Sequence, residues 1–99
     1  MNPDLVAVCS GFDWDDANAV KIRRKHAIVP EECEEAFENA PLVFADDPRH
    51  STRETRYRVI GQTNAGHILF MVFTIRDNLI RVISARRANR KERKEYHTP

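Results

Sequence analysis

The chain has 99 residues, of which 41% are hydrophobic and 31% charged, and its formal net charge is +1. This composition is typical of one folded, soluble domain and argues against a disordered chain or a second, cofactor-binding domain. The longest apolar run, residues 68–75, is too short to cross a membrane, and the N-terminal segment lacks a signal-peptide pattern, so we expect a cytoplasmic protein with no membrane partner.

Residues 1–11 predict an N-terminal extension, which we expect to be mobile, ahead of a domain formed by residues 12–99. Asp13 or Asp15 is a suitable N-cap for a first helix that runs to about His26. The apolar residues of this helix are expected to face inward: Trp14, Ala17, Val20 and Ile22.

Pro30 fits the first turn of a second helix, where Glu31 and Glu32 complement the positive end of the helix dipole. The apolar residues Cys33, Ala36, Phe37 and Ala40 follow with helical spacing, and Pro41 ends the helix. The position of Cys33 on this stripe predicts an ordinary buried thiol rather than a disulfide partner or a metal ligand.

Four strands are expected next, at residues 42–45, 56–60, 67–75 and 79–85. The third of them is apolar on both faces, as a central strand covered on both sides would be. A tight turn at Asp77-Asn78 joins it to the fourth strand. The order α-α-β-β-β-β-α predicts an α+β fold in which helices pack on an antiparallel sheet.

The last predicted helix is almost entirely charged. Asn89 and Glu92 have the spacing of a capping box that opens it, but only Ala88 and Tyr96 are available for burial. Residues 76–99 carry eight Arg or Lys against three acids, whereas residues 31–54 carry eight acids against two Arg. This segregation favours a polyanionic partner for the basic quarter of the chain, most simply a phosphate backbone.

Three segments, at residues 12–28, 56–75 and 80–96, read FDWDDANAVKIRRKHAI, RYRVIGQTNAGHILFMVFTI and IRVISARRANRKERKEY. In this order and spacing they resemble the BrnT family of bacterial type II toxins. The closing pattern I-R-x-I-S-A-R-x-A-x-x-x-E-x-x-x-Y is the most specific part. The chain departs from the family at Ala27, where Gly is usual at the end of the first helix, and at Asn89, where Thr is common.

The resemblance implies a single compact RelE/ParE-like α+β domain. It also implies a ribonuclease that inhibits translation until an antitoxin neutralises it. The residues themselves argue against metal catalysis, because no His or carboxylate pair stands at helical ligand spacing with a third group nearby. We therefore expect an endoribonuclease that cleaves mRNA without a metal ion or cofactor. The implied partner is a ribbon-helix-helix antitoxin of the BrnA type, bound as a toxin–antitoxin heterotetramer that contacts promoter DNA only through the antitoxin.

Metal-free RNA cleavage needs a base for the 2′-hydroxyl, an acid for the leaving oxygen, and fixed cations for the extra charge on the transition state. Arginine suits the last role because its planar fork grips phosphate oxygens and stays charged. We assign this role to Arg81 and Arg86, whose separation by five positions on the fourth strand predicts opposite faces, with Arg81 on the face of residues 79, 83 and 85. An ion pair with Glu54 is the structural alternative for Arg81.

The predicted catalytic residues are Arg81, Arg86, His26, Glu54 and Tyr96, and the predicted RNA-binding residues are Lys25, Arg56, Arg87, Arg90 and Arg93. His26 is the candidate proton shuttle, although with Lys25 it also suits the negative end of a helix dipole. Tyr96 either donates a proton or stacks on a base, as C-terminal tyrosines do in some RelE-like toxins, or it anchors the last helix. Arg56 either joins the basic surface or pairs with Glu54.

A non-catalytic binding module is the second class of function that the sequence leaves open. In such a module the C-terminal arginines hold an acidic protein segment or nucleic acid without cleaving it. Both classes predict salt-sensitive binding, but only a nuclease produces RNA fragments under metal-free conditions.

Overall fold

The computed structural model describes residues 4–47 and 53–98. Its elements, in chain order, are α1 (Asp4–Ala7), β1 (Gly11–Phe12), α2 (Asp16–His26), α3 (Pro30–Glu38), β2 (Val43–Asp46), β3 (Tyr57–Gln62), β4 (Ile68–Arg76), β5 (Leu79–Arg87) and α4 (Arg90–His97). The expected order of two helices, four strands and a last helix is confirmed. Two short elements precede it: α1 lies within the segment that the sequence predicts as an extension, and β1 spans the boundary between that segment and the predicted domain.

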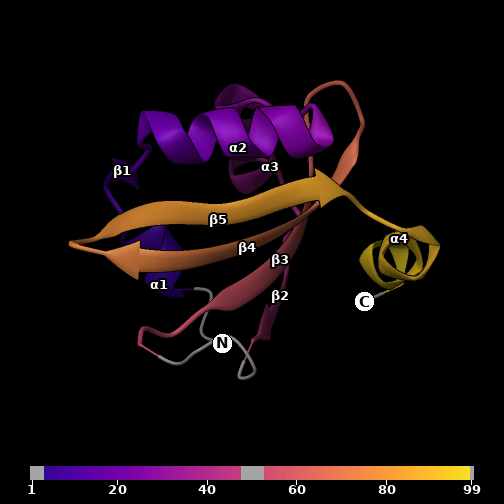
Figure 1. The fold of residues 1–99 in the computed structure, drawn as a ribbon. Coiled ribbons are helices and arrows are strands. Elements are labelled where there is room, and N and C mark those ends of the chain that lie inside the picture. Colours follow the sequence, from indigo (N-terminus) through magenta and orange to yellow (C-terminus); the bar gives the residue numbers. More distant parts are fainter. Residues whose placement is uncertain (1–3, 48–52, 99) are drawn as a thin grey trace.

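One five-stranded sheet organises the fold, with the strand order β1-β5-β4-β3-β2 (Figure 1). β4 lies at its centre, which confirms the prediction from its apolar sequence. β2 to β5 form antiparallel pairs, as expected. β1 instead pairs in parallel with β5, through Gly11 and Phe12, so the complete sheet is mixed.

Helices α2 and α3 cover one face of the sheet (Figure 1). The ring of Phe37 meets that of Phe73 edge-on, with centroids 5.2 Å apart. A Cβ on Gly61 would lie 2.7 Å from the carbonyl oxygen of Ala36, so this glycine allows α3 to lie close to β3. The core cluster on this face is formed by Ile22, Ile28, Cys33, Ala36, Phe37, Val59, Leu69, Met71, Phe73, Ile80, Val82 and Ala85.

Helix α4 covers part of the opposite face. Its Tyr96 is buried, and the hydroxyl donates to the carbonyl oxygen of Pro41 at 2.9 Å. A second apolar cluster forms there from Ile60, Ile68, Ala88 and Tyr96, with Val43 and Phe70 packed against it. Tyr96 of this charged helix therefore packs against apolar residues of β3 and β4 and against Ala88, which directly follows β5.

The ends of the helices follow the local sequence closely. Asp15 is the N-cap of α2 and accepts from the backbone N–H of Asn18 at 2.7 Å. Ala27 ends α2 in the left-handed conformation, with φ of 56°. Asn89 and Glu92 form the predicted capping box of α4, each side chain accepting from the other's backbone N–H at 2.9 Å.

The inward face of α2 differs from the prediction. Ile22 is buried, but Ala17 is exposed and Val20 is 54% exposed. The side-chain amide of Asn18 donates to the carbonyl oxygen of Val82 on β5, so Asn18 faces the sheet. Asn18 and Ile22, four positions apart, then share the face toward the sheet. Within the described ranges, no helix is long and apolar enough to cross a membrane.

Candidate functional site

A β-bulge in β5 decides which of its side chains share a face. Phe73 of β4 pairs with Val82, but the next pair along joins Val72 to Ser84, so Ile83 has no partner on β4. An extra residue of this kind reverses the alternation of side chains beyond it.

Arg81 and Arg86 consequently lie on the same face of the sheet. Arg81 pairs with Thr74 and Arg86 with Phe70, and these two β4 residues are an even number of positions apart. Ala85 instead joins the core cluster on the other face. The predictions that Arg81 and Arg86 face opposite sides, and that residues 79, 81, 83 and 85 share a face, are therefore wrong.

Four arginines from three strands lie on this face of the sheet, which we call the arginine face. They are Arg58 of β3, Arg76 of β4, and Arg81 and Arg86 of β5. Helices α2 and α3 cover the opposite face of the sheet. On the arginine face, α4 covers only the part near Ile60, Ile68 and Phe70.

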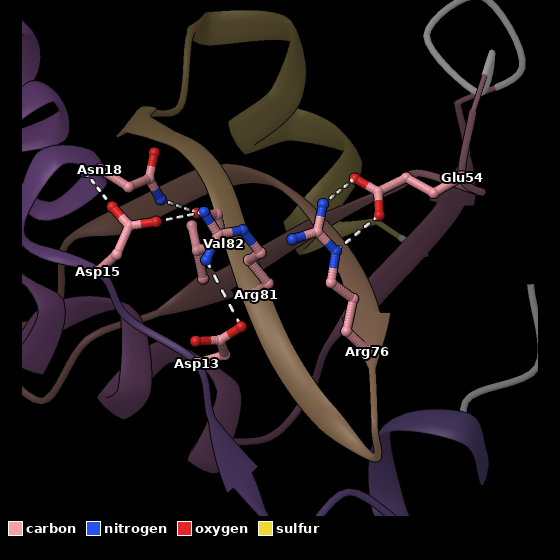
Figure 2. A network of polar contacts seen from close by, with 7 residues as sticks. All are labelled: Asp13, Asp15, Asn18, Glu54, Arg76, Arg81 and Val82. Carbon is pink, nitrogen blue, oxygen red and sulfur yellow. Dashed lines mark hydrogen bonds and ion pairs between the residues drawn. The ribbon is translucent and has the colours of Figure 1, made fainter.

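Two carboxylates hold Arg81 at the β1 end of the sheet. Its guanidinium contacts Asp15 and lies 3.5 Å from a carboxylate oxygen of Asp13 (Figure 2). Hydrogen bonds from Arg81 and then from the Asn18 backbone N–H lower the pKa of Asp15. The N-cap of α2 is thus also an anchor for Arg81, whose side chain is 18% exposed.

Glu54 accepts from Arg76 rather than from Arg81. The Arg76 guanidinium donates two hydrogen bonds, of 2.9 and 3.0 Å, to the two oxygens of Glu54 (Figure 2). This fork-to-fork contact lowers the pKa of Glu54 and raises that of Arg76. Glu54 therefore lies next to the arginine face as an ionised carboxylate. The alternative of an ion pair between Glu54 and Arg81 is replaced by the pairs of Arg81 with Asp13 and Asp15.

Arg86 links the sheet to α4. Its guanidinium donates two hydrogen bonds, of 2.7 and 2.9 Å, to Glu92 and lies 4.4 Å from the ring centroid of Phe70. Burial raises the pKa of Glu92, but the hydrogen bonds from Arg86 and from the Asn89 backbone outweigh it, so the pKa is lowered overall. Glu92, which completes the capping box of α4, is in this way also the counter-ion of Arg86.

Arg58 differs from the other three arginines because, within the described chain, its guanidinium contacts no carboxylate. Its Nε donates to the backbone carbonyl oxygen of Asp46 at 3.2 Å. Arg58 lines a cleft of about 260 Å³ beneath α4. Lys91 and Glu95 of α4 line the same cleft, and its remaining lining residues are Val43, Ala45, Val59, Ile60 and Phe70.

The other predicted catalytic residues are not brought to Arg81. His26 and Lys25 end α2, on the layer that covers the opposite face, and no described hydrogen bond or ion pair joins them to the arginine face. Tyr96 is buried under α4 with its hydroxyl bonded to Pro41, and burial raises its pKa. These contacts support the anchoring interpretation of Tyr96, whereas its catalytic role stays a prediction.

The predicted RNA-binding residues lie on different elements and do not form one cluster with Arg81. Arg56 directly precedes β3, and its carbonyl oxygen accepts from the backbone N–H of Asp47 at 3.1 Å. Arg87 pairs with Leu69 and so points to the side of α2 and α3. Arg90 and Arg93 are exposed on α4, where Arg93 donates to the carbonyl oxygen of Ala88 at 2.7 Å.

Neither cysteine is paired, and Cys33 is fully buried, which confirms the prediction of an ordinary thiol. Burial, followed by the charges of Glu32 and Glu34, raises its pKa to about 12. Across residues 4–47 and 53–98, no group of three or more His, Cys, Asp or Glu side chains has the arrangement of a metal site.

Sequence reasoning missed four charged residues of this surface. Two of them, Arg58 and Arg76, could have been placed by the alternation of side chains along a strand. Arg58, for example, lies two positions before buried Ile60 and so shares its face. Lys91 and Glu95 are four positions apart and therefore share one side of α4. That side was not identifiable from the sequence, because Tyr96 supplied too little apolar pattern to orient the helix.

A family model described as the ribonuclease toxin BrnT of type II toxin–antitoxin systems matches residues 14–92. This range contains α2, α3, β2 to β5 and the start of α4, and it includes all four arginines of the arginine face. A search of curated proteins found no match. Since the match covers most of the chain, the resemblance is confirmed, and the chain belongs to the BrnT family of ribonuclease toxins of type II toxin–antitoxin systems.

Proposed function

We propose that this toxin is a metal-independent endoribonuclease that cleaves mRNA in the cytoplasm, inhibits translation, and binds the scissile phosphate on the arginine face. The observation that carries the proposal is the bulge at Ile83, which brings Arg81 and Arg86 to one open face with Arg58 and Arg76. A single strand of RNA laid across this face meets cations from three neighbouring strands.

Cleavage of RNA by its own 2′-hydroxyl requires stabilisation of the charge on the transition state, which arginine side chains can provide. Attack of the 2′-hydroxyl on phosphorus forms a bond to phosphorus and expels the 5′-oxygen, with extra negative charge on the phosphate oxygens in between. We assign the neutralisation of that charge to Arg81 and Arg86, which their carboxylate partners hold in fixed positions. Glu54, kept ionised beside Arg76, is the carboxylate that we propose as base for the 2′-hydroxyl proton. Because His26 lies on the layer over the opposite face, we assign the proton that the leaving 5′-oxygen takes up to solvent water.

The family places an antitoxin as the partner of this chain. We propose that the antitoxin is a BrnA-like ribbon-helix-helix protein, that the complex is a heterotetramer, and that promoter DNA is contacted through the antitoxin. The basic C-terminal quarter of the chain supports an acidic occupant that would mask the arginine face. A copurified complex that cut RNA as fast as the free toxin would contradict this masking.

A single incubation tests the nuclease proposal. The purified, antitoxin-free toxin is mixed with a long RNA in EDTA, and fragments are separated over time. We expect fragments in EDTA and few in the variant Arg81→Ala. Salt-sensitive binding without fragments would instead support the second class of function, a non-catalytic module. That class has one structural observation in its favour, since Arg76, Arg81 and Arg86 already have carboxylate partners.

A further inference from the structure

We propose that the cleft between α4 and the sheet binds one nucleobase of the RNA, adjacent to the phosphate that the arginine face holds. The inference rests on the proposed ribonuclease function and extends it with a site that reads sequence. The cleft is the one lined by Arg58, Lys91 and Glu95 together with apolar residues of β2, β3 and β4.

The size and the floor of the cleft suit a flat ring system. Its volume of about 260 Å³ is just below the range of roughly 300–1,000 Å³ that drug-sized ligands occupy. Val43, Ile60 and Phe70 supply an apolar floor on which a base can stack or pack. A cleft of this size has room for one base.

The charged groups around the cleft are available for a ligand. In the described part of the chain, no hydrogen bond or ion pair engages the side chains of Lys91 and Glu95. Arg58 hydrogen-bonds to a backbone carbonyl oxygen and interacts with Glu92 through charge alone. Arg76, Arg81 and Arg86, by contrast, each bind a carboxylate. Two donors and one acceptor that lack side-chain partners thus converge on an apolar floor, as recognition of a polar ring edge requires.

The hydrogen-bonding groups match those of a base edge. Arg58 and Lys91 can donate to a ring nitrogen or exocyclic oxygen, while the carboxylate of Glu95 can accept from an amino group. The cleft also adjoins the phosphate site, because Phe70 lines the cleft and carries the Arg86 guanidinium 4.4 Å from its ring centroid. A phosphate on Arg86 would therefore place a neighbouring base over the cleft.

The test reads sequence preference instead of rate alone. A pool of random-sequence RNA is cut by the wild-type toxin, by Glu95→Gln and by Ala45→Trp, and the fragment ends are sequenced. Glu95→Gln converts an acceptor into a group that also donates. At one position near the cut, we expect the ratio of cleavage at the preferred base to cleavage at the other bases to change by about tenfold. Ala45→Trp fills the cleft from β2 without altering charge, and we expect it to weaken the preference at that same position.

Glu38→Gln is the matched control, since Glu38 is exposed at the end of α3 on the opposite layer. Cleavage with the same base preference in wild type, Glu95→Gln and Ala45→Trp would overturn the inference while leaving the ribonuclease proposal intact. If the wild type does not cut, the proposed function fails first. The cleft is then judged by NMR titration with a 2′-O-methyl oligonucleotide. Shifts of the Val43 and Ile60 methyl groups that Ala45→Trp abolishes support a base site, and their absence overturns it.

Discussion

Arg81 and Arg86 lie on the same face of the sheet although five positions separate them in the sequence, because Ile83 bulges out of the pairing between β4 and β5. Each has a carboxylate partner from a different part of the chain: Asp13 and Asp15 for Arg81, and Glu92 for Arg86. Two fixed guanidinium groups on one open surface are the arrangement that stabilisation of a phosphoryl transition state requires.

Arg81→Ala and Arg86→Ala are each expected to slow RNA cleavage roughly a hundredfold. The estimate follows from about 3 kcal/mol for the loss of one preorganised donor, at about 1.36 kcal/mol per tenfold in rate. Lysine at either position should restore only part of the rate, because it supplies charge without the bidentate fork. Cleavage rate and growth arrest are measured for each variant, and thermal melting checks folding.

Glu92→Gln separates charge from positioning, because it weakens the ion pair of Arg86 and leaves the guanidinium in place. We expect a smaller loss of cleavage rate from it than from Arg86→Ala. Ala at the exposed residues Arg90 or Arg93 should weaken RNA binding and flatten its salt dependence, with less effect on the cleavage step. If Arg81→Ala and Arg86→Ala melt normally and cut at the wild-type rate, β5 is a scaffold and the chemistry lies elsewhere.

The stability of the protein should fall in acid. Asp15, Glu54 and Glu92 all have a lowered pKa in the folded state, so the unfolded chain binds more protons below the ordinary value of 4.5 for Glu. Their contribution is complete above that pH and is lost as pH falls through the folded pKa values. We expect the melting temperature to be nearly constant from pH 6 to 8 and to drop below about pH 4.5. Glu92→Gln should lower the melting temperature at pH 7 by about 5 °C and make the acid drop shallower. An unchanged acid drop would show that Glu92 is not among its causes.

Ala27→Gly should stabilise the fold. Ala27 has φ of 56°, and the left-handed region costs an L-residue roughly 1–2 kcal/mol. Gly removes this strain but adds freedom to the unfolded chain, so we expect a net gain of about 0.5–1 kcal/mol in the free energy of unfolding. Urea denaturation measures it, and Ala19→Gly within the same helix should have the opposite sign.

Gly61→Ala should destabilise the protein by about 2 kcal/mol or more, because the added Cβ would lie 2.7 Å from the Ala36 carbonyl oxygen. Gly11→Ala is the matched control, since its Cβ would have Leu79 as its nearest neighbour, at 3.7 Å. Equal stability of the two variants would mean that α3 does not rest on β3 at Gly61.

Tyr96→Phe separates the two interpretations of this residue. The hydroxyl donates to Pro41, so its removal should cost about 1 kcal/mol of stability. We expect the cleavage rate to stay close to that of the wild type, because the anchoring ring is retained. A rate loss of a hundredfold or more with normal melting would assign Tyr96 to proton transfer.

Interactions between near neighbours in the chain were predictable from the sequence. The capping box of Asn89 and Glu92 formed as expected, and so did the turn at Asp77-Asn78, whose residues have φ of 52° and 62°. The central position of β4 followed from its apolar character on both faces. These features depend on residues a few positions apart or on the hydrophobicity of a whole strand, and both can be read from the amino-acid sequence. The family match confirmed the ribonuclease toxin that the three sequence segments had indicated.

The site itself was decided by tertiary structure. Strict alternation along β5 placed Arg81 and Arg86 apart, and only the register with β4 reveals the unpaired Ile83 that brings them together. Likewise, Glu54 was a reasonable partner for Arg81 by charge, but β1 and the α2 cap lie along β5 and bring Asp13 and Asp15 to it from 68 and 66 positions away. Sequence fixes which charges are available, whereas strand register and the choice among distant carboxylates depend on how the whole sheet is assembled.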